Sequence, residues 1–309
     1  MSTSQPQKVN FPSNGINIVG ELYRPSPNAT SRKNAAIAIG HPAFGVKEQT
    51  AANYARALST SGFYALTFDA AYQGESDGSP RGIENPFQRA EDVRAAVSFL
   101  ATLSEVDSER IGVLGICASG GYVPFAAQTD TRMKAVATVS AACLGSVLRD
   151  GLQPKGAITR EQLAEQLKGA NALRTLEAQD GEPRVVEFLP LERSAIPAGS
   201  PQLVTDGWDY YRTPRGAHPR STGTWVARSM DLCANFDSYA FVDMISPRPL
   251  LMIAGSEADT KYFSERAVEK AREPSELFIV QGKKHIDLYD DLSVTEPKLV
   301  DFFEKYLAA

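Results

Sequence analysis

The sequence has few of the residues on which redox, metal and acid–base chemistry depends. Its 309 residues include only 3 histidines and 3 cysteines. The cysteines, Cys117, Cys143 and Cys233, show no Cys-x-x-Cys spacing, which argues against a disulfide framework and against a zinc site. We therefore expect no metal and no other cofactor. Any reaction that needs a histidine has three candidates, His41, His218 and His285.

Basic clusters and long apolar runs are also missing. The net charge is −5 and no Lys/Arg-rich run occurs, so a nucleic-acid-binding surface is not expected. The first 30 residues contain no apolar stretch long enough for a signal peptide, and no run of about 18 apolar residues occurs anywhere. These absences predict a cytoplasmic protein that does not span a membrane.

What the sequence does contain is an alternation of buried strands with amphipathic helices. This alternation is typical of a mostly parallel, twisted sheet with helices on both faces, an α/β fold. The strands are predicted at 35–40, 63–69, 111–116, 133–140, 249–254 and 276–280, and the helices at 49–60, 86–103, 120–127 and 292–307. Residues 145–246 differ in composition, with more Gly, Pro and Arg. They are predicted to form a cap inserted into one domain that spans residues 1–309.

The segment IGVLGICASGG at 111–121 has the features of a nucleophile elbow, the sharp strand-to-helix turn of α/β-hydrolases. Gly115 and Ser119 are the small residues on either side of Cys117, and the strand ends where it should if Cys117 is at the apex. A second register, with Ser119 as the nucleophile, moves the turn two residues into the helix. We favour Cys117, whose thiolate a helix N-terminus and a nearby imidazole would stabilise by lowering the pKa of the thiol.

The partners of this nucleophile should follow it in the order acid, then base. His285 lies after the last predicted strand and fits the base, whereas His41 precedes the nucleophile and His218 falls in the insertion. The loop after 249–254 offers Glu257 and Asp259 as the acid, and we favour Asp259, which could also cap the following helix.

An oxyanion hole needs two backbone N–H donors near the nucleophile. The residue after Cys117, Ala118, supplies the first. The loop that follows the strand at 35–40 normally supplies the second, and Ala43 is the expected donor, with Phe44 as the alternative.

Six segments together resemble the dienelactone-hydrolase-related α/β-hydrolases, and within them the subgroup of polyketide transferases and thiohydrolases. They are HPAFGVKEQ at 41–49, FDAAYQGES at 68–76, GICASGGY at 115–122, YYRTPRGAHP at 210–219, PRPLLMIAGSEADTKYFSE at 247–265 and HIDLYD at 285–290. The resemblance covers nearly the whole chain. It implies a cysteine or serine nucleophile with aspartate and histidine, acting on acyl chains held as thioesters or esters.

The leading hypothesis is therefore a hydrolase or acyltransferase that forms an acyl-enzyme on Cys117. A carboxylesterase or lactone hydrolase is the alternative within the fold, and a lyase, a cyclase or a binding protein is the alternative of another class. The expected partner is a small-molecule acyl ester or thioester; an acyl chain on a carrier protein and a homodimer stay open. The candidates for the substrate pocket are the aromatic side chains Phe44, Trp208, Tyr210, Tyr211 and Trp225. The four that lie in the insertion could equally form the cap's own core.

Overall fold

The computed structural model describes residues 5–152 and 157–309. Its centre is an eight-stranded sheet in the order β1-β2-β4-β3-β5-β6-β9-β10. The strands are β1 Gln7–Ser13, β2 Ile16–Tyr23, β3 Ala36–Gly40, β4 Tyr64–Phe68, β5 Ile111–Ile116, β6 Ala135–Val139, β9 Leu250–Gly255 and β10 Ser275–Val280. Strand β2 pairs antiparallel with both β1 and β4, and all the other pairings are parallel. The predicted mostly parallel sheet is confirmed, and the hairpin β1–β2 extends it.

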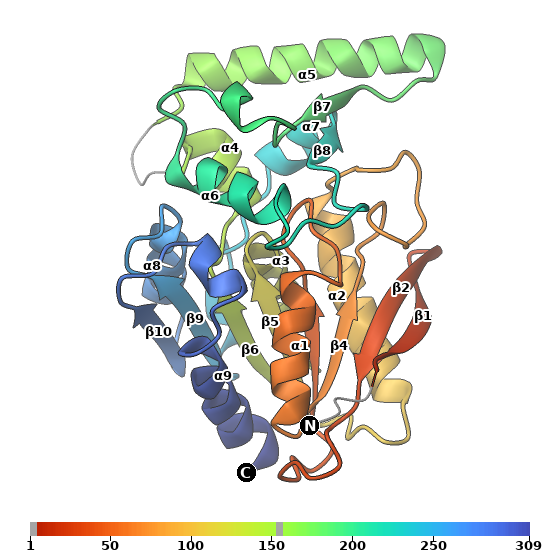
Figure 1. Cartoon of the computed structure of the whole chain (residues 1–309), viewed down its shortest axis with the longest axis vertical. Coiled ribbons are helices and arrows are strands. Elements are labelled where there is room, and N and C mark those ends of the chain that lie inside the picture. The colour runs from red at the N-terminus through yellow and green to blue at the C-terminus, as the bar shows by residue number, and fades with distance from the viewer. Residues whose placement is uncertain (1–4, 153–156) are drawn as a thin grey trace.

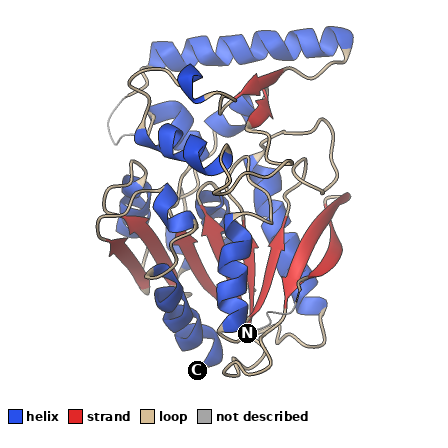
Figure 2. Ribbon diagram, viewed as in Figure 1, coloured by secondary structure: helices blue, strands red, loops and turns tan. Residues whose placement is uncertain are grey.

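Helices cover both faces of this sheet (Figure 2). On one face lie α1 (Thr50–Thr60) and α9 (Thr295–Phe303); on the other lie α2 (Pro86–Thr102), α3 (Ser119–Ala127) and α8 (Lys261–Lys270). Side chains of strand β3 contribute to the hydrophobic core on each face of the sheet. Its alanines Ala36 and Ala38 pack toward α2 and α3, whereas Ile37 and Ile39, one position along, pack toward α1 and α9. This alternation explains why a buried parallel strand has apolar residues at every position.

Residues between β6 and β9 form a cap above the carboxyl ends of the parallel strands (Figure 1). The cap consists of α4 Leu144–Asp150, α5 Arg160–Asp180, β7 Val185–Glu187, η1 Arg193–Ala195, α6 Gln202–Tyr211, β8 Thr224–Val226 and α7 Ser229–Ala234. The short helix η2 (Val242–Ile245) follows the cap and packs against α3 and α8 in the sheet domain. Helix α5 starts with a capping box, in which the Thr159 hydroxyl accepts from the Gln162 amide and the Gln162 side chain accepts from the Thr159 amide.

Several polar contacts join the cap to the loops at the top of the sheet, including three from residues 215–221. Gln49 donates to the carbonyl of Gly216 at 2.5 Å, and the Ser221 hydroxyl donates to the carbonyl of Phe44 at 2.6 Å. A third contact is the two-bond ion pair of Arg215 with Asp290, at 2.6 and 2.7 Å. The cap is therefore attached to loops near both ends of the site.

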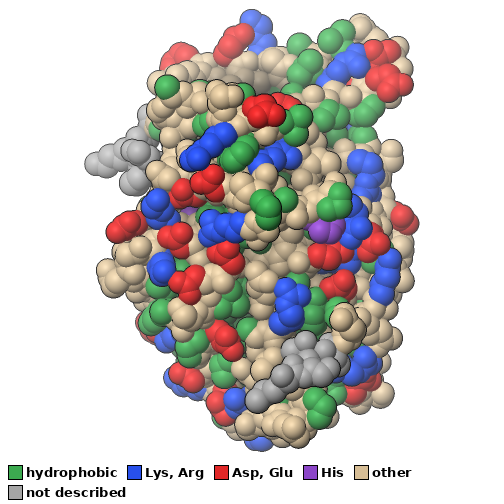
Figure 3. Space-filling view, in the orientation of Figure 1, with side chains coloured by type: hydrophobic (Ala, Val, Ile, Leu, Met, Phe, Trp, Pro, Cys, Tyr) green, Lys and Arg blue, Asp and Glu red, His purple; other side chains and the backbone are tan. Residues whose placement is uncertain are grey.

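The outer surface of the molecule mixes charges of both signs on the face that Figure 3 shows. Within the described residues, no helix is both long enough and apolar enough to cross a lipid bilayer.

Candidate active site

Cys117 stands at the apex of a sharp turn between a strand and a helix. Strand β5 ends at Ile116 and α3 begins at Ser119, and Cys117 has a left-handed φ of 56°. The turn depends on glycine at position 115, where a Cβ atom would lie 2.1 Å from the carbonyl oxygen of Ser119. A non-glycine residue in the left-handed region is strained, and such strain persists where the surrounding structure holds it.

Ser119, the alternative nucleophile, has a different environment. It is the first residue of α3 and is 3% exposed, and its hydroxyl donates to the carbonyl of His41 at 2.6 Å. Cys117 is half-buried and lines a cavity, which Ser119 does not. Only the cysteine of this pair faces space that a substrate could occupy.

Two backbone amides approach the sulfur of Cys117, those of Ala118 and Ala43. Neither donates to a backbone carbonyl elsewhere in the described chain. The loop that presents Ala43 turns at Phe44, which has a φ of 61°. Two N–H donors that converge on a nucleophile and lack another acceptor are what an oxyanion hole requires. Both are the donors expected from the sequence.

Buried charged side chains stabilise the loop that presents the Ala43 amide. The guanidinium of Arg89 donates to the carbonyl of His41 at 2.8 Å and to its ring Nε2 at 2.9 Å, and it pairs with the carboxylate of Glu84 at 3.1 Å. His41 Nε2 also accepts from the amide of Ala70, and its Nδ1 lies 2.7 Å from the carbonyl of Pro42. Burial and the charge of Arg89 lower the pKa of His41 well below its usual range, so the ring is neutral. His41 therefore stabilises the loop through these hydrogen bonds.

The predicted base, His285, is 1% exposed and precedes the short helix η3 (Ile286–Tyr289). Its Nδ1 lies 2.5 Å from the hydroxyl oxygen of Thr260. The structure departs here from the expected acid, because Asp259 accepts a hydrogen bond from the amide of Leu203 in α6, at 3.1 Å. No hydrogen bond joins Asp259 to His285 among the described residues. The loop therefore turns its carboxylate toward the cap and its neighbouring hydroxyl toward the imidazole.

The base and the nucleophile do not touch directly. In the part of the chain that the structure describes, no hydrogen bond connects His285 to Cys117. The hydroxyl of Tyr289 lies 3.2 Å from His285 Nε2 and is close enough to the sulfur to affect the pKa of the Cys117 thiol. The predicted imidazole beside the thiol is thus replaced by a phenol.

The thiol is neutral in this environment, contrary to the sequence-based expectation of a lowered pKa. Burial raises the pKa of Cys117 above its usual value, and this outweighs the opposing effects of the Tyr289 hydroxyl, the two amides and Arg89. Burial also lowers the pKa of His285 to about 3. The site therefore holds a thiol and a neutral imidazole. Attack by this sulfur on a substrate would require the thiol to lose its proton.

The cavity in front of Cys117 has a volume of about 100 Å³, space for several water-sized groups. Among the residues that the structure describes, its wall contains no ionisable side chain other than Cys117 and two tyrosines. The sheet domain contributes Ala43, Phe44, Cys117, Ala142, Ile286 and Tyr289, and the cap contributes Leu144, Val147, Leu152, Phe188, Leu189, Leu203, Val204, Gly207, Tyr211 and Gly223. An apolar wall of this kind suits an uncharged apolar group.

Of the five aromatic residues expected in the pocket, Phe44 and Tyr211 lie in its wall and the other three do not. Trp208 donates its indole N–H to the carbonyl of Pro190, and Tyr210 packs edge-on against Tyr289 at 5.1 Å. Trp225 packs behind Phe44, with ring centres 5.9 Å apart. These three side chains stabilise the cap and the wall from outside, because their rings are already covered by neighbours.

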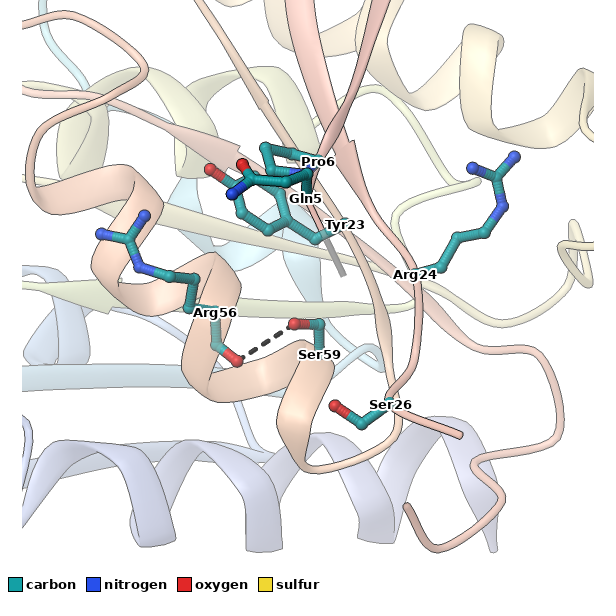
Figure 4. A pocket seen from close by; sticks show the side chains of 7 residues that line it. All are labelled: Gln5, Pro6, Tyr23, Arg24, Ser26, Arg56 and Ser59. Atoms are coloured by element: carbon teal, nitrogen blue, oxygen red, sulfur yellow. Dashed lines mark hydrogen bonds between the residues drawn. The ribbon is translucent and has the colours of Figure 1, made fainter. Parts of the chain in front are cut away.

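Other polar sites in the molecule lack this combination of groups. The hollow in Figure 4 lies at the opposite, amino-terminal end of the strands and is lined by Gln5, Pro6, Tyr23, Arg24, Ser26, Arg56 and Ser59. The carboxylates of Glu48, Asp69 and Glu75 approach one another closely, but the ammonium of Lys47 lies among them, 2.7, 2.8 and 2.7 Å from their oxygens. That cluster is occupied by a cation that the chain itself provides.

Three residues of the site were not anticipated from the sequence, namely Thr260, Tyr289 and Arg89. A signal for Tyr289 exists: it stands four residues after His285 in HIDLYD, and residues at this spacing share a helix face. Thr260 is adjacent to the expected acid, and choosing between neighbours in a loop needs the fold. For Arg89, a single arginine on a predicted helix gives no signal of burial.

Two comparisons with known proteins show which family the chain belongs to. The model of the dienelactone hydrolase family matches residues 21–148. The uncharacterized protein YcjY of Escherichia coli (strain K12) is 37% identical over 296 residues, which cover 94% of this chain and 95% of that protein. The chain belongs to the dienelactone hydrolase family.

Solved structures related to this dienelactone hydrolase family member share its α/β-hydrolase fold. The crystal structure of the hypothetical protein PA2218 from Pseudomonas aeruginosa has a TM-score of 0.92 at 37% identity and covers 99% of this chain and 95% of that one. The α/β hydrolase GrgF from Penicillium sp. sh18 has a TM-score of 0.82 at 22% identity, with coverage of 98% and 99%. In sequence, the polyketide transferase grgF of Penicillium sp is 24% identical over 306 residues, 95% of this chain and 94% of that protein. The chain is thus an enzyme of the hydrolase or acyltransferase type.

Proposed function

We propose that this protein transfers acyl groups from esters or thioesters through a covalent acyl-enzyme on Cys117. The observation that carries the proposal is the placement of the Cys117 sulfur, at the apex of the elbow, between two free amides and an apolar cavity. A thiol suits a thioester donor, because exchange of one thioester for another is nearly isoenergetic. The polyketide transferase that resembles this chain in sequence lends support to an acyl substrate.

In the proposed reaction the sulfur attacks the acyl carbonyl, and the amides of Ala43 and Ala118 stabilise the negative oxygen of the tetrahedral intermediate. His285 receives the proton of the thiol and returns it to the leaving thiol or alcohol. Water or an alcohol then attacks the thioester on Cys117. The hydroxyl of Thr260 holds the imidazole through Nδ1, the role that an acid has in the more common triad.

The wall of the cavity also limits the substrate. Because the described residues of the wall include no arginine or lysine, they offer no partner for a carboxylate or phosphate beside the reacting carbonyl. The proposed substrates are uncharged acyl groups, short enough in the first instance to fit about 100 Å³. Any carrier that brings the acyl chain would stay outside the cavity.

The test uses p-nitrophenyl esters and acyl-thioesters with the wild-type protein and three variants. Cys117→Ala should abolish turnover, and His285→Ala should reduce it by about 100-fold or more. Ser119→Ala is the matched control, since it removes a hydroxyl two residues away that faces His41. Mass spectrometry of wild-type protein mixed with the thioester should find the acyl group on the peptide that contains Cys117.

Two results would contradict the proposal. Turnover in Cys117→Ala together with its loss in Ser119→Ala would move the nucleophile to the serine. A wild-type protein that forms no adduct and turns over neither esters nor thioesters would favour a binding function on this fold.

A further inference from the structure

The hydroxyl of Tyr289 occupies the space through which a proton must pass from the nucleophile to the base. It lies 3.2 Å from His285 Nε2, and Tyr289 and Cys117 are neighbours in the wall of one cavity. Both Cys117 and Tyr289 also line the cavity, so the substrate carbonyl would approach beside the same hydroxyl. Within the described residues this hydroxyl is the polar group that links the sulfur to the imidazole.

The ring of Tyr289 is held in place by its neighbours. It is 1% exposed and packs edge-on against Tyr210 at 5.1 Å and against Tyr211 at 6.4 Å. It also lies in η3, four residues after His285, so the phenol and the imidazole are presented from the same helical turn. Because packing fixes the ring, the phenol cannot swing aside to let His285 reach Cys117 without disturbing these contacts.

The hydrogen bonds around His285 define a direction for the proton. When Nδ1 carries its hydrogen, it donates to the hydroxyl oxygen of Thr260 at 2.5 Å. Nε2 then has a free lone pair that accepts the O–H of Tyr289, and the phenol oxygen in turn accepts from the thiol of Cys117. Each donor in this series of hydrogen bonds has one acceptor.

We propose that Tyr289 is a catalytic proton relay between Cys117 and His285, a role that rests on the proposed function of Cys117. As the Cys117 sulfur bonds to the acyl carbon, its S–H proton moves to the oxygen of Tyr289. The O–H proton of Tyr289 moves at the same time to His285 Nε2. The phenol is neutral before and after, the imidazole gains one proton, and the carbonyl oxygen gains the negative charge.

The second half of the step runs the relay in reverse. The imidazolium returns its proton through Tyr289 to the leaving sulfur or oxygen as the tetrahedral intermediate collapses. A buried imidazole is a weak base, so the imidazolium releases this proton readily. Burial and the neighbouring Cys117 raise the pKa of Tyr289 well above its usual range, which keeps a free phenolate out of the cycle and requires the two proton transfers to be coupled.

Tyr289→Phe tests the relay by removing one oxygen from a packed ring. We expect kcat/KM for acyl-thioesters to fall by about 100-fold or more, the scale of general acid–base catalysis, with a thermal unfolding midpoint close to that of the wild type. Tyr210→Phe is the matched control: it removes the hydroxyl of the ring that packs on Tyr289 and should keep kcat/KM within about threefold.

A second readout reports on the thiol itself. The rate at which iodoacetamide alkylates Cys117 should show a pH midpoint that is higher in Tyr289→Phe than in the wild type, because the hydroxyl that stabilises the thiolate is gone. In Tyr210→Phe the midpoint should not change. A variant that is merely loosened around the ring would expose the thiol and shift the midpoint downward instead.

A third measurement needs no variant and stays informative if Tyr289→Phe fails to fold. The acylation rate of the wild type in mixtures of H2O and D2O should curve downward as expected for two protons in flight, whereas direct transfer to His285 gives a straight line. A straight line, or near-wild-type acylation by Tyr289→Phe, would overturn the relay. If Cys117→Ala still turns over acyl substrates, the failure lies with the proposed nucleophile and not with the relay alone.

Discussion

The two sides of the site use opposite kinds of polar group. The early loops, residues 41–49 and 69–76, are held by buried ionised side chains, of which Lys47 is 1% exposed and has three carboxylate partners. The late loops, residues 255–260 and 285–290, bring a hydroxyl, an imidazole and a phenol together in and behind the cavity wall, all neutral. Both sides are buried, so exposure to solvent does not explain the difference.

The difference corresponds to two tasks. A buried ion pair in fixed geometry resists displacement strongly, because separating it leaves an uncompensated charge. Such pairs suit the early loops, whose backbone must present the Ala43 amide. Neutral groups in hydrogen-bonding reach of one another can exchange protons without creating a lasting charge, which suits the late loops. The following predictions test this division, from the largest expected effect to the smallest.

Arg89→Met should cause the largest loss, because it removes the cation that holds the early loop and leaves Glu84 buried without its partner. We expect the free energy of unfolding to fall by about 3–5 kcal/mol, measured by denaturant titration. Arg94→Met is the matched control on the same helix, where the ion pair with Glu91 is partly exposed and should contribute about 0–1 kcal/mol. If both variants lost the same free energy of unfolding, the buried ion pair would not stabilise the early loop more than an exposed pair does.

Thr260→Val should have an intermediate effect, confined to catalysis. It leaves Nδ1 of His285 without its hydroxyl partner, a cost of about 1–3 kcal/mol, so kcat should fall by about 10- to 100-fold with little change in KM. Asp259→Asn is the comparison and should stay within about threefold of the wild type, since the carboxylate faces the amide of Leu203. If steady-state kinetics showed a larger loss of kcat in Asp259→Asn than in Thr260→Val, Asp259 and not Thr260 would be the partner of His285. The late loops would then also depend on an ionised group.

Phe188→Ala should have the smallest effect, limited to substrate preference. Its ring stacks on Phe44 with centres 4.4 Å apart at the wall of the cavity. Loss of an aromatic pair worth about 0.5–1.5 kcal/mol should lower kcat/KM by roughly 3- to 10-fold for longer acyl esters and less for acetyl esters. Leu191→Ala changes an exposed residue of the same cap segment and should leave the chain-length profile unaltered.

Structural features that depend on neighbouring residues in the sequence, such as strand bounds and turns, were predictable. Strand β5 has the predicted bounds, 111–116, since its residues are apolar throughout and a glycine-containing turn ends it. The same pattern locates Cys117 at the turn. The antiparallel hairpin β1–β2 was not predicted, although its burial alternates along β1, as expected of a strand with one solvated face.

The parts that depend on distant contacts were not predictable. The direction of the Asp259 carboxylate is set by the amide of Leu203, 56 residues away along the chain. Sequence order favours an aspartate as the acid and cannot tell that its neighbour Thr260 faces the imidazole. Aromatic residues of the cap pose the same problem, because Trp208 and Trp225 are equally suited to a pocket wall and to packing behind one.

The contacts that attach the cap have a consequence for engineering. Gln49 and Phe44 bind the cap from the segment that holds the Ala43 amide, and Asp290 binds it from the segment that holds His285. A graft of the cap from a relative, intended to change acyl specificity, would therefore bring mismatched partners to both segments. A functional chimera should exchange residues 41–49, 255–260 and 285–290 together with residues 144–234, since Asp259 also accepts a hydrogen bond from the cap. The donor's attachment points and its reactive loops then move as one unit.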